Sequence, residues 1–156
     1  MNKVLLQLFG ALLIFVCVVF SILNYSIKNR QFTCNKYILN TYLYIILTFN
    51  IMAIQLLLME YNGVSFNPSL MLFIGIFIMS LVFIVLLHKI SPLNIVLKHF
   101  VWLIFILLLG LIFYPMYTSF IDKKEMILSA ILTTVVLFIG LSALAYLKPE
   151  YISLSW

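Results

Sequence analysis

Residues 69–87 read SLMLFIGIFIMSLVFIVLL, a continuous apolar stretch without a charged side chain. A helix needs roughly 20 apolar residues to cross the hydrocarbon core of a bilayer, which is about 30 Å thick. The stretch does not alternate between apolar and polar residues, as a strand of a membrane barrel would. It therefore predicts a membrane-spanning helix, whose backbone hydrogen bonds are all satisfied within the segment.

Four further runs share this character, at residues 4–27, 37–59, 95 or 99 to 120, and 126–147. The segments between the runs hold nearly all the charged residues, Asn and Pro. The first run is longer than the apolar core of a removable signal peptide, so we interpret it as a retained anchor. The predicted fold class is all-α, a polytopic membrane helix bundle with about five transmembrane helices.

The composition of the whole chain agrees with this prediction. Of 156 residues, 66% are hydrophobic and 8% are charged, whereas a soluble domain carries about 25% charged residues. This composition excludes a soluble globular enzyme and also a disordered chain, which would be polar and charged. The excess of Ile and Lys over Ala and Arg suggests an AT-rich coding sequence, as in organelles and many large DNA viruses.

The basic residues predict the orientation, because short cytoplasmic loops are enriched in Lys and Arg. Six lie on one predicted side and three on the other, Lys3, Lys123 and Lys124. We therefore expect the N-terminus outside or in a lumen and the C-terminus in the cytosol-equivalent compartment. Beside anionic lipid headgroups, each cation contributes about 1 kcal/mol. The predicted headgroup contacts are Lys28, Arg30, Lys36, Lys89, Lys98 and Lys148.

Polar residues in the second run suggest contacts between helices. Thr41, Thr48 and Gln55 are seven residues apart, which keeps them on one helical face, while Asn40 and Asn50 lie on other faces. Such side chains can hydrogen-bond to a neighbouring helix. The alternative is a polar pathway through the membrane, but no run has an ionisable residue near its centre to relay a proton or cation. We favour helix packing.

The fifth run carries a face of small residues, which allows another helix backbone to approach closely. We expect this helix at the centre of the bundle or at an oligomer contact. The face comprises Ser129, Thr133, Gly140 and Ala143, widened by Ala130 and Thr134.

Pro115, with Tyr114 and Tyr117 beside it, is predicted to kink or end the fourth helix near a membrane interface. Tyr is favoured at that depth because its ring is apolar and its hydroxyl is polar.

No set of residues suggests catalysis, a metal or a cofactor. Cys17 and Cys34 are separated by too much helical chain, about 25 Å, to form a disulfide. His88 and His99 have no nearby carboxylate or thiol to complete a metal site, and we place both at the headgroups. We therefore expect no enzyme, no metal and no cofactor. No basic stripe with interleaved aromatic residues suggests nucleic-acid binding.

Several ordered motifs resemble the Bax-inhibitor family of polytopic membrane proteins. The basic, Tyr-containing entry FTCNKYILNTY at residues 32–42 is similar to the start of that family's core. SPLN at 91–94 is similar to its Pro-x-Asn entry to a third helix. The later matches are Leu97, Phe100, Gly110 and Tyr117, then ILSA at 127–130, Thr133 or Thr134, LFIGL at 137–141 and KPEYIS at 148–153.

The resemblance implies two regions, an N-terminal anchor helix with a basic loop over residues 1–36 and a four-helix membrane core over residues 37–156. In the family, three further helices follow and carry paired carboxylates implicated in a proton-sensitive calcium leak. We expect this chain to have the shared architecture without those helices. The resemblance therefore does not support ion conduction by this chain alone.

Three functions remain open. The first, which we favour, is a non-enzymatic structural or anchoring subunit of a larger membrane-associated assembly, such as the membrane-containing virion of a large DNA virus. Its partners are the bilayer and other membrane or assembly proteins. The second, implied by the resemblance, is a regulator of cell death or calcium leak in host endomembranes. The third is a channel formed by an oligomer, which requires a polar pore lining.

Overall fold

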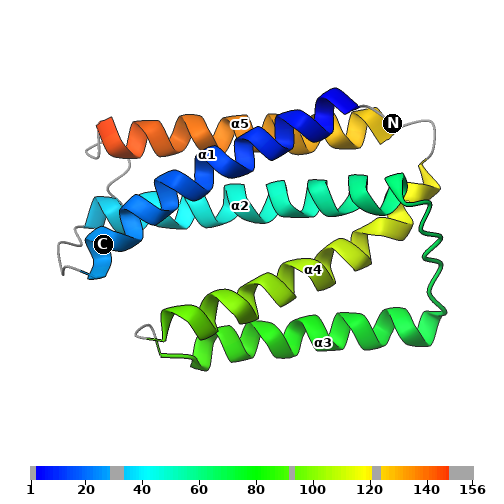
Figure 1. Cartoon of the computed structure of the whole chain (residues 1–156). Helices are drawn as coiled ribbons and strands as arrows, with labels where there is room; N and C mark the ends of the chain where they lie inside the picture. The colour runs from blue at the N-terminus through cyan, green and yellow to red at the C-terminus, as the bar shows by residue number, and fades with distance from the viewer. Residues whose placement is uncertain (1–2, 29–33, 92–93, 121–123, 148–156) are drawn as a thin grey trace. The chain divides into compact units, whose positions relative to one another are not determined.

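Five helices make up the chain in a computed structural model, which describes residues 3–28, 34–91, 94–120 and 124–147 (Figure 1). The predicted helical fold class is confirmed, because each apolar run forms one helix. The helices are α1 (Lys3–Lys28), α2 (Cys34–Tyr61), α3 (Leu70–Lys89), α4 (Ile95–Ser119) and α5 (Lys124–Leu147).

Four of the helices are long and apolar enough to cross a membrane. The spans are Leu39–Tyr61, Leu70–Lys89, Ile95–Ser119 and Lys124–Ala145. In α1, the stretch Gln7–Val19, whose side chains are described without a gap, is also apolar. The chain is therefore a multi-pass helical membrane protein, and a fifth crossing by α1 stays a prediction.

The helix α3 shows most directly why the fold needs a bilayer. Only 6% of its most apolar window is buried, against 44% for α2. Its exposed side chains include Leu70 and Met71, which are 76% and 85% accessible. A continuous apolar surface of this kind is unfavourable in water and favourable against lipid.

The chain divides into two compact units, each described here by itself. Unit 1 contains residues 52–127, which are the second half of α2, α3, α4 and the start of α5. Unit 2 contains residues 2–51 and 128–156, which include α1, the first half of α2 and the rest of α5. The sequence predicted a different division, between an anchor region at residues 1–36 and a core at residues 37–156. That division rests on the family resemblance and not on packing, and it stays a prediction.

In unit 2, a buried amide joins α2 to α1. Asn50 is fully buried, and its amide is oriented so that Nδ2 donates to the Phe9 carbonyl (2.9 Å) while Oδ1 accepts from the Leu13 N–H (3.0 Å). A buried amide needs such partners because an unsatisfied polar group costs about 1–3 kcal/mol. Asn50 therefore fixes the position of α2 along α1.

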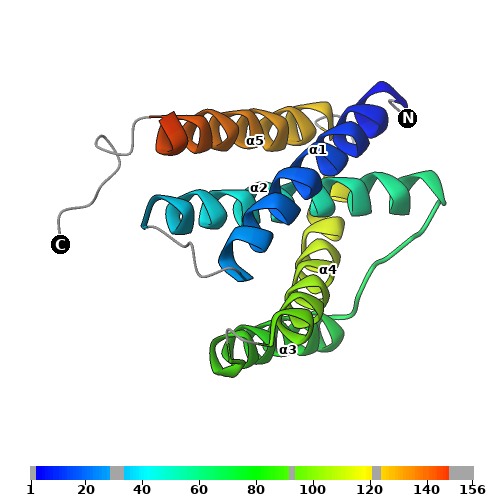
Figure 2. The same ribbon diagram turned by 60° about the vertical axis from the view of Figure 1, so that its left-hand side comes forward.

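In unit 1, α4 packs against α3 where the two helices are connected, and its other end reaches the carboxyl end of α2 (Figures 1 and 2). The contact with α2 is close at Gly110, where an added Cβ would overlap the Gln55 carboxamide. Gln55 Nε2 donates to the Leu107 carbonyl of α4 (3.0 Å). The missing side chain at Gly110 is therefore what admits Gln55 to the α4 backbone.

We predict that Gly110→Ala has a free energy of unfolding about 0.5–1.5 kcal/mol below that of Gly75→Ala, because the new methyl group displaces the Gln55 carboxamide from its hydrogen bond to the Leu107 carbonyl. The expected cause is the overlap between the new methyl group and the Gln55 side chain. Denaturant titration of the purified protein in bicelles measures the change.

Gly75→Ala is the matched control, because a Cβ at Gly75 in α3 meets no atom within 4 Å. The double variant Gln55→Ala with Gly110→Ala should regain stability relative to Gly110→Ala. Equal stability of the two single glycine variants would contradict the proposed close contact.

Candidate functional site

The end of α2 is set by a glycine. Gly63 has a φ of 62°, a conformation that glycine adopts without steric cost. Its N–H donates to the Glu60 carbonyl (3.1 Å), and the Val64 N–H donates to the Met59 carbonyl (3.0 Å), which together form a Schellman motif. This turn ends α2 at Tyr61, one residue beyond Glu60.

The end of α4 is held by hydroxyl groups. The sequence predicted that Pro115 kinks or ends this helix. The helix continues four residues past Pro115 to Ser119, so it does not end at the proline. The Thr118 Oγ1 donates to the carbonyls of Tyr114 (3.2 Å) and Pro115 (3.0 Å), and the Ser119 Oγ donates to the Pro115 carbonyl (2.7 Å). These bonds satisfy carbonyl groups of the last turn, which have few backbone partners at a helix end.

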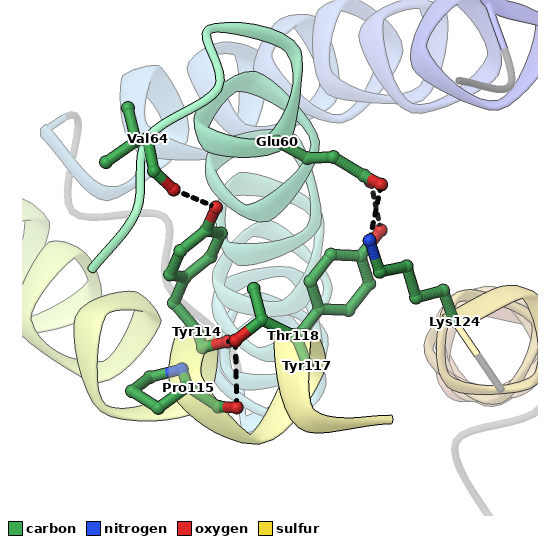
Figure 3. Close-up of polar contacts among 7 residues, drawn as sticks. All are labelled: Glu60, Val64, Tyr114, Pro115, Tyr117, Thr118 and Lys124. Atoms are coloured by element: carbon green, nitrogen blue, oxygen red, sulfur yellow. Dashed lines mark hydrogen bonds and ion pairs between the residues drawn. The ribbon is translucent and has the colours of Figure 1, made fainter. Parts of the chain in front are cut away.

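Glu60, Tyr117 and Lys124 meet at these helix ends, and we call them the Glu60 cluster (Figure 3). The Lys124 Nζ donates to Glu60 Oε1 (2.7 Å), and the Tyr117 hydroxyl donates to Glu60 Oε2 (2.6 Å). The Lys124 ammonium also lies 5.5 Å from the centre of the Tyr117 ring, within the range of a cation–π contact. One carboxylate therefore links α2, α4 and the start of α5.

A second tyrosine fastens the loop after α2. The Tyr114 hydroxyl donates to the Val64 carbonyl (2.5 Å), and the rings of Tyr114 and Tyr117 lie 6.4 Å apart (Figure 3). Both tyrosines are buried, at 2% and 1% exposure. Their rings pack in the apolar interior of unit 1 while their hydroxyl groups reach the polar end of the helices.

The Glu60 cluster stabilises unit 1 mainly through its buried hydroxyl bond. The side chains of Lys124 and Glu60 remain 24% and 29% exposed, and ion pairs that water reaches contribute about 0–1 kcal/mol. The bond from the buried Tyr117 hydroxyl to a carboxylate belongs to a stronger class, at about 1.5–3 kcal/mol.

A hollow of about 440 Å³ lies beside the Glu60 cluster. Its wall comes from the loop after α2, the last turn of α4 and Lys124 at the start of α5. Lys124 is the charged residue of this wall, and Val64, Phe66 and Pro115 give it an apolar part.

The sequence does contain a signal for the pairing of Glu60 with Lys124. Glu60 and Lys124 follow and precede apolar runs that end on the same predicted side of the membrane, and their charges are opposite. Tyr114 and Tyr117 were predicted at an interface because of their type, without their partners. The acceptors, Val64 carbonyl and Glu60 carboxylate, depend on how α2 and α4 pack.

The stripe predicted on α2 is divided between different contacts. Gln55 bonds to α4, as described, whereas the Thr48 Oγ1 donates to the Tyr44 carbonyl of its own helix (2.8 Å). Thr41 is exposed. Asn50, which we placed on another face, makes the bonds to α1.

The small-residue face predicted on α5 is exposed in the chain. Ser129, Thr133, Gly140 and Ala143 all face outward, while Leu128, Ile131 and Val135 are buried. The Thr133 hydroxyl bonds within the helix to the Ser129 carbonyl (2.8 Å). This face is therefore free to pack against a helix of a second molecule, and that contact stays a prediction.

The predicted headgroup cations are described only in part. Lys89 is exposed in the last turn of α3, and Lys98 is half-buried in the first turn of α4. The side chains of Lys28 and Lys36, like Arg30 and Lys148, lie outside the residues that the structure describes.

The thiol and imidazole groups form no evident reactive site in the described residues. Cys17 is exposed on α1 with a free thiol, and the side chain of Cys34 lies outside the described part. His99 Nδ1 lies 2.7 Å from the Ile95 carbonyl, and its ring meets Trp102 edge-on. Among the described residues, no three His, Cys, Asp or Glu side chains are grouped to hold a metal.

The helices define a class of protein, a multi-pass membrane protein, and the Glu60 cluster joins three helix ends within its unit 1. The sequence model of one family, described as "Inhibitor of apoptosis-promoting Bax1", matches residues 34–156. The chain belongs to the Bax-inhibitor family, as its motifs predicted. Comparison with curated proteins and with solved structures gave no match.

We predict that Tyr117→Phe lowers the free energy of unfolding by about 1.5–3 kcal/mol, because it removes the hydrogen bond to the Glu60 carboxylate. The ring and its packing stay in place. Denaturant titration in bicelles measures the loss, and combination with Glu60→Gln should give a less than additive effect.

Tyr61→Phe is the control, since Tyr61 lies on the same helix end as Glu60 but is 64% exposed. It should change the stability by less than about 0.5 kcal/mol. A Tyr117→Phe variant as stable as Tyr61→Phe would show that the hydroxyl bond contributes nothing.

Proposed function

We propose that the chain is a Bax-inhibitor-like regulator of cell death in host endomembranes, acting through contacts with other membrane components and without catalysing a reaction. The observation that carries the proposal is the family match over residues 34–156, because that family is described as inhibiting a protein that promotes apoptosis. The match covers helices α2 to α5, whose described spans are suited to a bilayer.

The position of the charges supports contact rather than ion conduction. Glu60 lies at the end of its helix and is engaged by Lys124 and Tyr117. The deeper amides, Asn50 and Gln55, bond to neighbouring backbone groups. A relay for protons or cations usually needs ionisable groups inside the membrane, so these contacts favour a regulator that does not conduct.

We also propose an orientation with the N-terminus outside or luminal and the C-terminus on the cytosolic side. The bias of Lys and Arg among the connecting segments supports it. In this orientation the Glu60 cluster faces the outside or the lumen.

A second candidate is an anchoring subunit of a larger membrane-associated assembly, for example in the inner membrane of a virion. The observation that favours it is the amount of helix surface left unpacked. Both α3 and the small-residue face of α5 are exposed in the single chain, and small residues allow close approach of a partner helix.

We predict that cells expressing the chain survive a Bax-dependent death stimulus better than cells with an empty vector, with no change in luminal calcium. Counting surviving cells while a luminal calcium reporter is followed measures both effects. Gly110→Ala should weaken the protection, and Gly75→Ala should retain it at equal protein level.

Two other outcomes of this experiment would contradict the proposal. Unchanged survival at confirmed expression would refute the regulator. A fall in luminal calcium that accompanies protection would replace the contact mechanism with a leak.

The anchoring candidate predicts that the chain co-fractionates with other proteins of its native assembly in a fixed ratio after mild detergent extraction. Quantitative mass spectrometry across a density gradient measures that ratio. Recovery only as a free monomer would refute this candidate.

A further inference from the structure

The hollow beside the Glu60 cluster is lined by hydrogen-bond donors and by acceptors. Its volume, about 440 Å³, falls within the range of roughly 300–1,000 Å³ that is typical of small-molecule sites. All of its lining residues belong to unit 1. The chemistry of these residues indicates what the hollow can bind.

The donors come from Lys124 and the loop after α2. The Lys124 ammonium has three N–H groups, and one donates to Glu60. Among the described residues, the backbone N–H groups of Ser65, Phe66 and Asn67 donate to no other group. A cation together with unpaired backbone N–H groups suits a phosphate.

The acceptors come from the last turn of α4. The hydroxyl hydrogens of Thr118 and Ser119 are used in bonds to the Tyr114 and Pro115 carbonyls, so their oxygens offer only lone pairs to a ligand. They lie at the carboxyl end of a helix, where the helix dipole favours a positive charge. An ammonium group with N–H donors fits these acceptors.

The net charge of the hollow selects among phosphate compounds. Among the residues that the structure describes, Lys124 is the charged residue that lines the hollow, and it is paired with Glu60. A ligand without net charge therefore leaves no unbalanced charge in a partly buried site. A zwitterion offers a phosphate to Lys124 and an ammonium to the Ser119 oxygen, so it supplies a partner for each kind of lining group.

The location of the hollow indicates a lipid as the source. Its lining residues follow the end of α2, form the last turn of α4 and begin α5. The ends of membrane-spanning helices are expected near the headgroups. Val64, Phe66 and Pro115 supply apolar surface for the glycerol and the upper part of the acyl chains.

We propose that this hollow is a binding site for the headgroup of an ethanolamine phospholipid. Lys124 and the N–H groups of residues 65–67 hold the phosphate, and the Thr118 and Ser119 oxygens accept from the primary ammonium. A choline headgroup has no N–H to donate, so the site discriminates against it. The proposal does not depend on the function proposed above.

The test compares ethanolamine and choline phospholipids with identical acyl chains. The full chain is exchanged from detergent into each lipid in turn, and retained lipid is counted by native mass spectrometry alongside thermal unfolding. We expect the ethanolamine lipid to be retained about tenfold better, the effect of one hydrogen bond to a charged group. Equal retention of the two lipids in the unaltered protein would overturn the proposal.

Matched variants separate lipid binding from the stability of the ion pair. Lys124→Gln should weaken the retention of both lipids, because both carry the phosphate, whereas Glu60→Gln frees the Lys124 ammonium and should keep or increase retention. A merely structural ion pair predicts the same loss for both variants, which would overturn the proposal. Ser119→Ala should reduce the preference for ethanolamine, and Ser129→Ala, on the exposed face of α5, should leave it unchanged.

A competition experiment with free phosphoethanolamine distinguishes a lipid headgroup from a soluble phosphate compound as the ligand. We expect it to displace the lipid only at concentrations far above that of the lipid, because it lacks the contacts of the glycerol and acyl chains. Displacement at equal concentration would assign the hollow to a soluble phosphate compound and overturn the lipid proposal.

Discussion

A charged side chain at the centre of a bilayer costs about 2.5–3.5 kcal/mol on insertion scales, and this cost governs where the polar groups of the chain lie. The central parts of the apolar runs carry no Asp, Glu, Lys, Arg or His. Glu60 and Lys124 lie at helix ends, where they pair with each other and remain partly open to water. The apolar surface of α3, in contrast, is left exposed because lipid is its favourable surrounding. The Glu60 cluster lies at the helix ends because the charged side chains are kept apart from the apolar surface.

Amides replace charges in the interior of the helices. Asn50 bonds to the backbone of α1 in unit 2, and Gln55 bonds to the backbone of α4 in unit 1. Each amide forms directional hydrogen bonds that fix the local position of one helix against the other, because apolar side chains make few directional contacts. Gly110 shows how closely such a contact is built, since its lack of a side chain makes room for Gln55. The two halves of α2 therefore use one amide each, of which Asn50 is fully buried and Gln55 is half-buried.

The Glu60 cluster of unit 1 lies within the part of the chain that matches the Bax-inhibitor family. The Glu60 cluster ties the end of the first family helix, α2, to the third and fourth, α4 and α5. A cluster at the ends of helices acts on packing and on headgroups rather than on ions inside the membrane. This is the physical basis for proposing a regulator that works by contact, and for placing a lipid beside the cluster.

The sequence by itself determined the helices and the family. Continuous apolar runs, such as residues 69–87, have one stable arrangement in lipid, and the motifs from residue 32 onward identified the family before any geometry was known. Gln55 and Tyr117 were recognised as polar groups suited to contacts, without their partners. Only the tertiary structure decided those partners, because 52 residues separate Gln55 from Leu107 and 64 separate Glu60 from Lys124. Periodicity places a side chain on a face of its own helix, but the helix opposite it is chosen by packing of the whole unit.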